Sequence, residues 1–286
     1  MRKEFLLLFF TCFLSTLSFA QKSDLQAKLE TILDKFKGEA GLFAWNMKTG
    51  EKVEINADTI FPTASIVKVP ILVGVFDKIE KGELTYRQPL IYRDSIKYGG
   101  SGLMQHFKDS TETDLSTLIS LMITYSDNTT SLWCQALAGG GSRVNELMEE
   151  LGLQHTRINS RTPGRESKWE VYGWGQTTPR EMATLLVKIR NGEVVSKSAS
   201  ERMYRLMTNI YYDENALSAI PPYIQTASKQ GMVNASRSEL VMVNSHSGDY
   251  VFYIATKNNA DTRWEDDNEA YELQREVSKL LWEYWK

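Results

Sequence analysis

The sequence predicts a mixed α/β fold with two lobes, in which an antiparallel sheet is built from both ends of the chain. Strand patterns occur near the two ends, and helical apolar spacing dominates the middle. We therefore expect residues 21–61 and 218–286 to form one α/β lobe whose sheet is covered by terminal helices. Residues 62–217 should form a second, mainly helical lobe.

The N-terminal part of the α/β lobe contains a helix and a hairpin. Residues 25–36 have the apolar spacing of a helix. Residues 40–47 and 52–55 resemble short strands, and the turn signal Lys48-Thr49-Gly50-Glu51 between them predicts a hairpin.

The middle of the chain is dominated by helix patterns. One begins near Ser65 and continues to about residue 81, and apolar positions recur at helical spacing over 115–151 with an interruption at the glycines 139–141. Residues 159–177 show no clear period and predict a long loop. Thr178 can cap the next helix, with Pro179 at its first position.

Three strands and a helix are expected at the C-terminal end. The strand patterns cover 224–232, 240–244 and 250–256, and the last two are joined by a turn at 247–249. Residues 268–285 predict a final amphipathic helix.

The first twenty residues have the features of a secretory signal. Arg2 and Lys3 provide positive charge, an apolar run follows, and Ala20 ends a small-x-small cleavage site. The apolar run is about half the roughly 20 residues that a membrane span needs. We therefore expect an exported protein, periplasmic or secreted, with no stable membrane span after cleavage.

Composition argues against several classes of function. The formal net charge of −3 offers nothing basic for a nucleic-acid backbone. Beyond the signal only Cys134 remains, so an internal disulfide cannot form. The three histidines are scattered without metal-ligand spacing, so neither a metal site nor a cofactor is expected.

A serine and a lysine lie three residues apart where the helix near residue 65 begins. Positions three apart share a helix face, so the amine of Lys68 can reach the hydroxyl of Ser65. Serine is a weak nucleophile until a base removes its proton, and an amine can do this when desolvation lowers its pKa. The alternative is a solvated helix face, which the apolar residues 66–76 disfavour.

Two further short motifs follow along the chain. Ser126-Asp127-Asn128 can also be explained as a helix N-cap, which all three residue types favour. Lys229-Gln230-Gly231, at the end of a strand pattern, can also be explained as a solvated strand terminus.

Together the three motifs, in this order, resemble those of the serine β-lactamases and penicillin-binding proteins, class A enzymes in particular. Further segments resemble the same family over almost all of the mature chain. These are Gly100-Ser101-Gly102-Leu103, the stretch from Asn128 to Gly140, and Thr177-Thr178-Pro179 with Met182-Ala183.

The resemblance implies a monomeric serine hydrolase whose substrate is a β-lactam or the D-Ala-D-Ala end of a peptidoglycan stem peptide. Ser65 would attack the carbonyl carbon, with Lys68 as a base. Ser126 would pass a proton to the leaving nitrogen as a general acid. The N–H groups of Ser65 and Met232 would bind the oxyanion.

The resemblance also implies four substrate-binding side chains. Asn128 would hold the acylamide group and orient Lys68. Lys229 and Arg237 would attract the substrate carboxylate, although the spacing to Arg237 is one residue short. Gln230 replaces the usual Thr or Ser, and its longer amide can still donate a hydrogen bond to a carboxylate.

The glutamate that activates the deacylating water in class A enzymes has no clear counterpart here. Glu170 follows a tryptophan, as in the family pattern, but lies too close to Pro179, and Trp174 stands where a partner asparagine would be. Glu166 is a second candidate, and both can equally be surface carboxylates.

Three functions therefore remain open. A β-lactamase that turns over is the leading interpretation, with a role in antibiotic resistance. The second is a D,D-peptidase or penicillin-binding esterase that deacylates slowly. The third is a lactam sensor without catalysis, which the absence of an obvious signalling domain disfavours.

Overall fold

The computed structural model describes residues 24–286, so the predicted signal over residues 1–20 lies outside the described part of the chain. Its central feature is a five-stranded antiparallel sheet with strand order β2-β1-β10-β9-β8. The strands are β1 (Glu39–Asn46), β2 (Lys52–Ile55), β8 (Thr226–Val233), β9 (Ser236–Val243) and β10 (Tyr250–Lys257). Both ends of the chain contribute strands, as the sequence predicted, and β1 and β2 form the expected hairpin.

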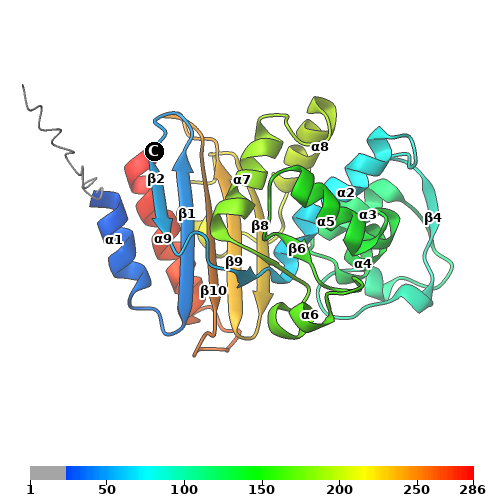
Figure 1. Ribbon diagram of the computed structural model, residues 1–286, viewed down its shortest axis with the longest axis horizontal. Helices are drawn as coiled ribbons and strands as arrows, with labels where there is room; N and C mark the ends of the chain where they lie inside the picture. Colours follow the sequence, from blue (N-terminus) through cyan, green and yellow to red (C-terminus); the bar gives the residue numbers. More distant parts are fainter. Residues whose placement is uncertain (1–23) are drawn as a thin grey trace, which may run out of the picture.

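The terminal helices α1 (Asp24–Leu33) and α9 (Glu269–Trp285) cover one face of this sheet, as Figure 1 shows. Alternate strand residues point to this face, so Val241 and Phe252 pack with Leu29 and Val277 in one apolar core. The opposite face packs on α7 (Pro179–Arg190) and on the 3₁₀ turn η1 (Ala64–Val67), which leads into α2 (Lys68–Glu80).

The second lobe is mainly helical and adjoins the β8 edge of the sheet (Figure 1). Its other helices are α3 (Leu115–Thr124), α4 (Asn128–Leu137), α5 (Gly140–Glu150), α6 (Glu166–Tyr172) and α8 (Lys197–Met207). Two small sheets complete it, made of β3 (Phe61–Pro62), β6 (Arg157–Ile158) and β7 (Gly175–Thr177), and of β4 (Pro89–Ile91) and β5 (Glu112–Asp114).

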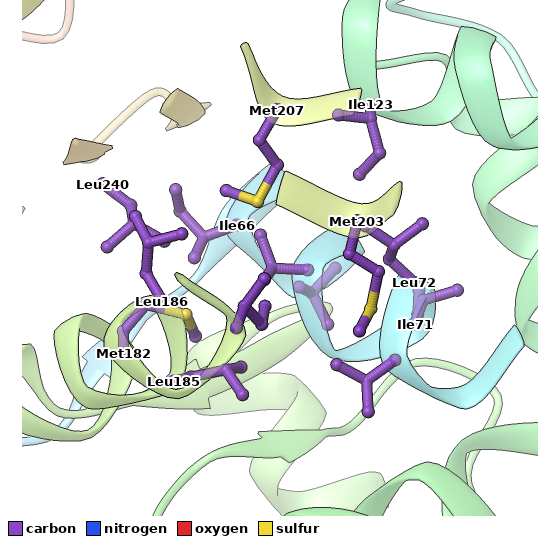
Figure 2. Close-up of a cluster of buried hydrophobic side chains, with 14 of the residues drawn as sticks. Ile66, Ile71, Leu72, Ile123, Met182, Leu185, Leu186, Met203, Met207 and Leu240 are labelled. Carbon is purple, nitrogen blue, oxygen red and sulfur yellow. The ribbon is translucent and has the colours of Figure 1, made fainter. Parts of the chain in front are cut away.

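A second apolar core joins the two lobes, and α2 runs through it. Figure 2 shows Leu72 of α2 beside Met203 of α8, and Leu240 of the sheet toward Leu186 of α7. Ile66, in the turn that leads into α2, belongs to the same buried cluster. Burying such a helix on all sides fixes its start relative to the β8 edge. The residues at that start are the ones that the sequence singled out.

Two sequence expectations differ from the structure. The predicted loop over 159–177 contains the short helix α6, whose residues are mostly exposed and therefore lack apolar periodicity. The strand expected to begin at residue 240 begins at Ser236, because four polar residues pair with β8 before the apolar run. These polar residues are buried, which the sequence pattern did not indicate.

Residues 24–286 contain no helix that is both long enough and apolar enough to cross a membrane.

Candidate active site

The start of α2 places Ser65 and Lys68 together. A 3₁₀ turn, η1 (Ala64–Val67), precedes the helix, and its backbone contacts strand β8 so closely that a Cβ on Gly231 would lie 2.3 Å from the Thr63 carbonyl oxygen. Only glycine allows this approach. Strand β8 therefore passes directly beside the nucleophile predicted from the sequence.

Lys68 is completely buried, and its amine is surrounded by hydrogen-bond partners. Its Nζ lies 2.9 Å from Ser65 Oγ, 2.9 Å from Asn128 Oδ1 and 2.6 Å from the Ser126 carbonyl oxygen. Burial lowers the pKa of Lys68 well below its usual value, and the nearby charge of Lys229 lowers it further. Such a shift favours the neutral form of the amine, which is the form that can accept the proton of Ser65.

Ser126 lies in the turn between α3 and α4, with a left-handed backbone (φ 52°) that directs its hydroxyl toward the lysines. Its Oγ lies 3.1 Å from Lys68 Nζ and 3.1 Å from Lys229 Nζ. A hydroxyl between two amines can receive a proton from one and donate its own. This geometry suits the predicted proton donor to a leaving group.

Asp127 shows that the N-cap interpretation of this motif is also correct. Its carboxylate accepts hydrogen bonds from the Thr130 N–H (2.8 Å) at the start of α4 and from the Met104 N–H (2.7 Å). Asn128 then donates to the Gly99 carbonyl at 3.1 Å while accepting from Lys68. The motif therefore caps a helix and presents two site residues at once.

Lys229 reaches the same centre from β8. It is fully buried, and its Nζ donates to Ser126 Oγ and, at 3.0 Å, to the Gln230 carbonyl. Burial lowers the pKa of Lys229 to about 7, although the Glu239 carboxyl opposes the shift. The structure therefore gathers Ser65, Lys68, Ser126, Asn128 and Lys229 into one hydrogen-bonded cluster, as the sequence predicted.

Gln230 does not present its N–H groups to a substrate in this structure. Its Nε2 donates to the Tyr212 carbonyl at 2.9 Å and approaches Glu239 Oε1 at 3.4 Å. The expected hydrogen bond to a substrate carboxylate is therefore not available as predicted. The physical reason is the buried Glu239 opposite Gln230 in the neighbouring strand, which competes for the same amide.

Arg237 is also not placed as expected. It is fully buried, and its guanidinium donates to the carbonyl oxygens of Asn234, Ser236 and Arg263 and lies over the rings of Trp264 and Tyr271. Side chains alternate between the faces of a strand, so a displacement of one residue in the sequence changes the face. The short spacing noted in the sequence therefore removes this arginine from the cleft.

Two cavities meet at the cluster and share Ser65, Asn128 and Met232. The first, of about 530 Å³, is lined by Tyr98, Trp174 and the residues around Val233. The second, of about 450 Å³, extends past Lys229 toward Trp264. Met232, whose N–H group is the predicted oxyanion donor, lines both cavities together with Ser65.

Neither candidate glutamate lines a cavity that contains Ser65. Glu166 and Glu170 are exposed on α6, where Glu166 accepts from the Gly164 N–H. Both line a further hollow, which shares Tyr98 and Trp174 with the first cavity. Trp174 lines the cavity that contains Ser65, and the centroid of its ring lies 5.8 Å from Lys68 Nζ.

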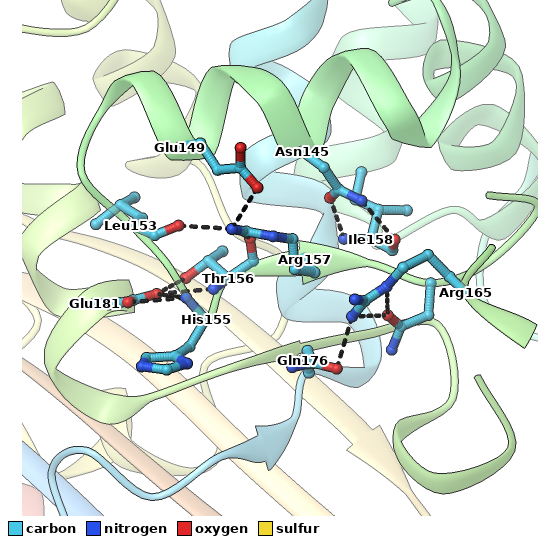
Figure 3. A network of polar contacts seen from close by, with 11 residues as sticks. Asn145, Glu149, Leu153, His155, Thr156, Arg157, Ile158, Arg165, Gln176 and Glu181 are labelled. Atoms are coloured by element: carbon cyan, nitrogen blue, oxygen red, sulfur yellow. Dashed lines mark hydrogen bonds and ion pairs between the residues drawn. The ribbon is translucent and has the colours of Figure 1, made fainter. Parts of the chain in front are cut away.

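The segment that carries these glutamates is held by polar contacts (Figure 3). Arg165 donates to Asn159 Oδ1 and Gln176 Oε1, both at 2.8 Å, which fastens the beginning of α6 to β7. At the next helix, Glu181 accepts from the backbone of His155 and Thr156. These hydrogen bonds fix the beginning of α6, so its two glutamates lie at the exposed surface, while Val171 and Tyr172 at its end line the cavity that contains Ser65.

Comparisons with known proteins show that the chain is similar to β-lactamases. A family model described as "Beta-lactamase enzyme family" matches residues 24–285. Beta-lactamase VEB-1 of Pseudomonas aeruginosa is 23% identical, with 97% of this chain and 95% of that protein covered. Beta-lactamase SME-1 of Serratia marcescens is 25% identical over 76% of this chain and 74% of its own.

Solved structures share the fold. The structure of PBP-A has a TM-score of 0.81 at 28% identity, covering 92% of this chain and 96% of its own. TLA-3 extended-spectrum beta-lactamase has a TM-score of 0.82 at 19% identity, covering 91% and 98%. The predicted mixed α/β architecture is therefore confirmed.

Proposed function

Because the chain belongs to the β-lactamase enzyme family, we propose that it is a serine hydrolase that opens β-lactam rings through an acyl-enzyme on Ser65. The observation that carries the proposal is the 2.9 Å contact between Ser65 Oγ and the buried amine of Lys68. The lowered pKa of Lys68 makes this amine a usable base.

Acylation follows from the contacts of the cluster. Lys68 takes the proton of Ser65 as its oxygen forms a bond to the lactam carbonyl carbon. The N–H groups of Ser65 and Met232 bind the resulting oxyanion, and each such donor is worth roughly 10²–10³ in rate. When the carbon–nitrogen bond breaks, Ser126 donates its proton to the leaving nitrogen. Lys68, 3.1 Å away, can return a proton to Ser126.

Asn128 and Lys229 support these steps by position. Asn128 joins Lys68 to the Gly99 carbonyl, and its amide lines both cavities, where it can hold an acylamide side chain. Lys229 holds the Ser126 hydroxyl at 3.1 Å and contributes positive potential beside the leaving group.

A second candidate function is a penicillin-binding esterase or D,D-peptidase whose acyl-enzyme is long-lived. The specific observation that favours it is the placement of Glu166 and Glu170 outside the Ser65 cavities, with Trp174 beside Lys68. A missing general base costs about 10²–10⁴ in deacylation rate. The acyl-enzyme complex of a PBP-A variant with penicillin G, at 28% identity and TM-score 0.80, is consistent with such chemistry on this fold.

We also propose that the protein acts after export, since residues 1–20 have the pattern of a secretory signal.

Mass spectrometry after mixing with penicillin G tests both candidates. A covalent adduct on a peptide containing Ser65 is expected. Rapid loss of the adduct with steady hydrolysis of a chromogenic cephalosporin supports a β-lactamase that turns over, whereas one burst followed by a persistent adduct supports slow deacylation. Absence of any adduct on Ser65, with hydrolysis continuing, would contradict the proposed site.

A further inference from the structure

The second cavity continues past Lys229 along the edge of β8. Its far wall comes from two loops that lie outside the motif cluster, one before η4 (Ala216–Ala219) and one before α9. The residues that these loops contribute are Tyr212, Glu214, Asn215, Trp264 and Asp266, with Tyr271 from α9 itself.

Gln230 is one of the residues that line this cavity, and its side chain contains a buried acceptor that lacks a partner. Because the Tyr212 carbonyl can only accept, the 2.9 Å contact fixes the amide with its nitrogen toward Tyr212. The Gln230 Oε1 atom then has no hydrogen-bond partner among residues 24–286, although the side chain is only 2% exposed. Leaving a buried acceptor unpaired is unfavourable, so a ligand N–H at this place would be favoured.

The charged side chains of the cavity also favour a ligand that carries hydrogen-bond donors. Glu214 and Asp266 are exposed carboxylates, and neither is paired with a lysine or arginine in the described chain. The guanidinium of Arg237 lies beneath Trp264 and does not line this cavity. Its two terminal nitrogens donate to three carbonyl oxygens, and its Nε has no partner among residues 24–286. Lys229 is the only cationic side chain of residues 24–286 that lines this cavity.

The carboxylate of a substrate bound past Lys229 would therefore meet the carboxylates of Glu214 and Asp266 and the amide oxygen of Gln230. It would meet no second cation among the described residues that line the cavity. We propose that this end of the cleft binds a substrate group that carries N–H donors, an ammonium or a carboxamide, in place of a carboxylate. This inference rests on the proposed acylation of Ser65 and names the substrate class for that site. The rings of Tyr212 and Trp264 also suit an ammonium, since aromatic faces attract cations.

The test uses three ligands that differ only at the group predicted to enter this end of the cleft. They are penicillin G, its carboxamide, and the 2-aminoethylamide of the same acid. The second-order rate of acylation at Ser65 is measured by mass spectrometry and divided by each ligand's rate of alkaline hydrolysis, which removes differences in ring reactivity. We expect both amides to exceed penicillin G by about 10- to 100-fold, as one or two hydrogen bonds to a buried acceptor allow.

Two variants locate the effect. Gln230→Thr replaces the acceptor amide by a hydroxyl, so the normalised carboxamide-to-acid ratio should fall about tenfold. The double variant Glu214→Gln/Asp266→Asn changes only exposed carboxylates and serves if the buried substitution prevents folding. It should selectively slow the aminoethyl ligand if the group recognised is an ammonium, and leave the carboxamide preference in place if it is an amide.

The possible outcomes distinguish failure of the N–H subsite from failure of the proposed acylation of Ser65. Acylation of Ser65 with penicillin G equal to or faster than both amides would overturn the N–H subsite and leave the proposed function intact. Absence of an adduct on Ser65 with all three ligands would overturn the proposed function itself, and this inference with it.

Discussion

The two sides of the cleft around Ser65 differ in the polar groups that they present. On one side Lys68, Ser126, Asn128 and Lys229 are joined by hydrogen bonds of 2.9 to 3.1 Å. On the other side the segment 159–177 presents Trp174 and directs its glutamates to solvent. Under the proposed function, forming an acyl-enzyme and hydrolysing it would depend on separate parts of the fold, and only the first part presents candidate catalytic groups in the cleft.

The largest effect should come from removing the nucleophile. Ser65→Ala should lower the rate of lactam consumption by about 10⁶, because no other step can replace the covalent one. Stopped-flow assay of a chromogenic cephalosporin, with circular dichroism as a check on folding, measures it. Undiminished turnover in the folded variant would place the chemistry elsewhere in the molecule.

A carboxylate introduced into the segment 159–177 should speed hydrolysis of the acyl-enzyme. Trp174→Glu puts a base into the cavity that contains Ser65, beside Lys68, and should speed deacylation by about 10²–10⁴ if the geometry allows a water between them. The lifetime of the penicillin G adduct reports the change. Trp174→Gln is the matched control, since it opens the same space without a base. An equal gain in that control would show that access of water, and not a base, limits the reaction.

The first side of the cleft was largely predictable from the sequence, because its residues are fixed by local pattern. A buried helix with two polar residues three apart, and a Ser-Asp-Asn turn that caps a helix, both carry their structural reasons within a few residues. Segments stabilised by contacts with distant parts of the chain were harder to predict from the sequence. The short strands β6 and β7 have little pattern of their own, and α8 lay in a region where no element was predicted.

The misplaced binding residues have a similar cause. Whether Gln230 can reach a substrate depends on Glu239 across the strand pair and on the Tyr212 carbonyl, neither of which a motif contains. Arg237 was expected on the correct strand but points to the other face. Register between strands is a property of the folded sheet, so spacing along the chain could raise a doubt about Arg237 without resolving it.

The coupling between the two lysines predicts a change in pH dependence. Below its own pKa of about 7, Lys229 is charged and helps lower the pKa of Lys68, so Lys229→Met should allow the pKa of Lys68 to rise. Since Lys68 acts only when neutral, the rising limb of acylation against pH should move to higher pH. Acylation rates of both proteins from about pH 5 to 10 measure the displacement. An unmoved limb in the variant would indicate that another group sets it.

The smallest effect on acylation is expected for Asp127, which lies between Ser126 and Asn128. Asp127→Ala removes the acceptor for Thr130 N–H and Met104 N–H, and loss of a helix cap costs about 0.5–2 kcal/mol of stability. Asp114→Ala is the matched control, because Asp114 caps the adjacent helix α3 through Thr117 without contacting the cluster. Urea unfolding should show a loss for both variants, but only Asp127→Ala should also slow acylation, since Ser126 and Asn128 adjoin it. If both variants lost stability and neither lost acylation rate, the geometry of the cluster would have to be held by Lys68 and Lys229 alone.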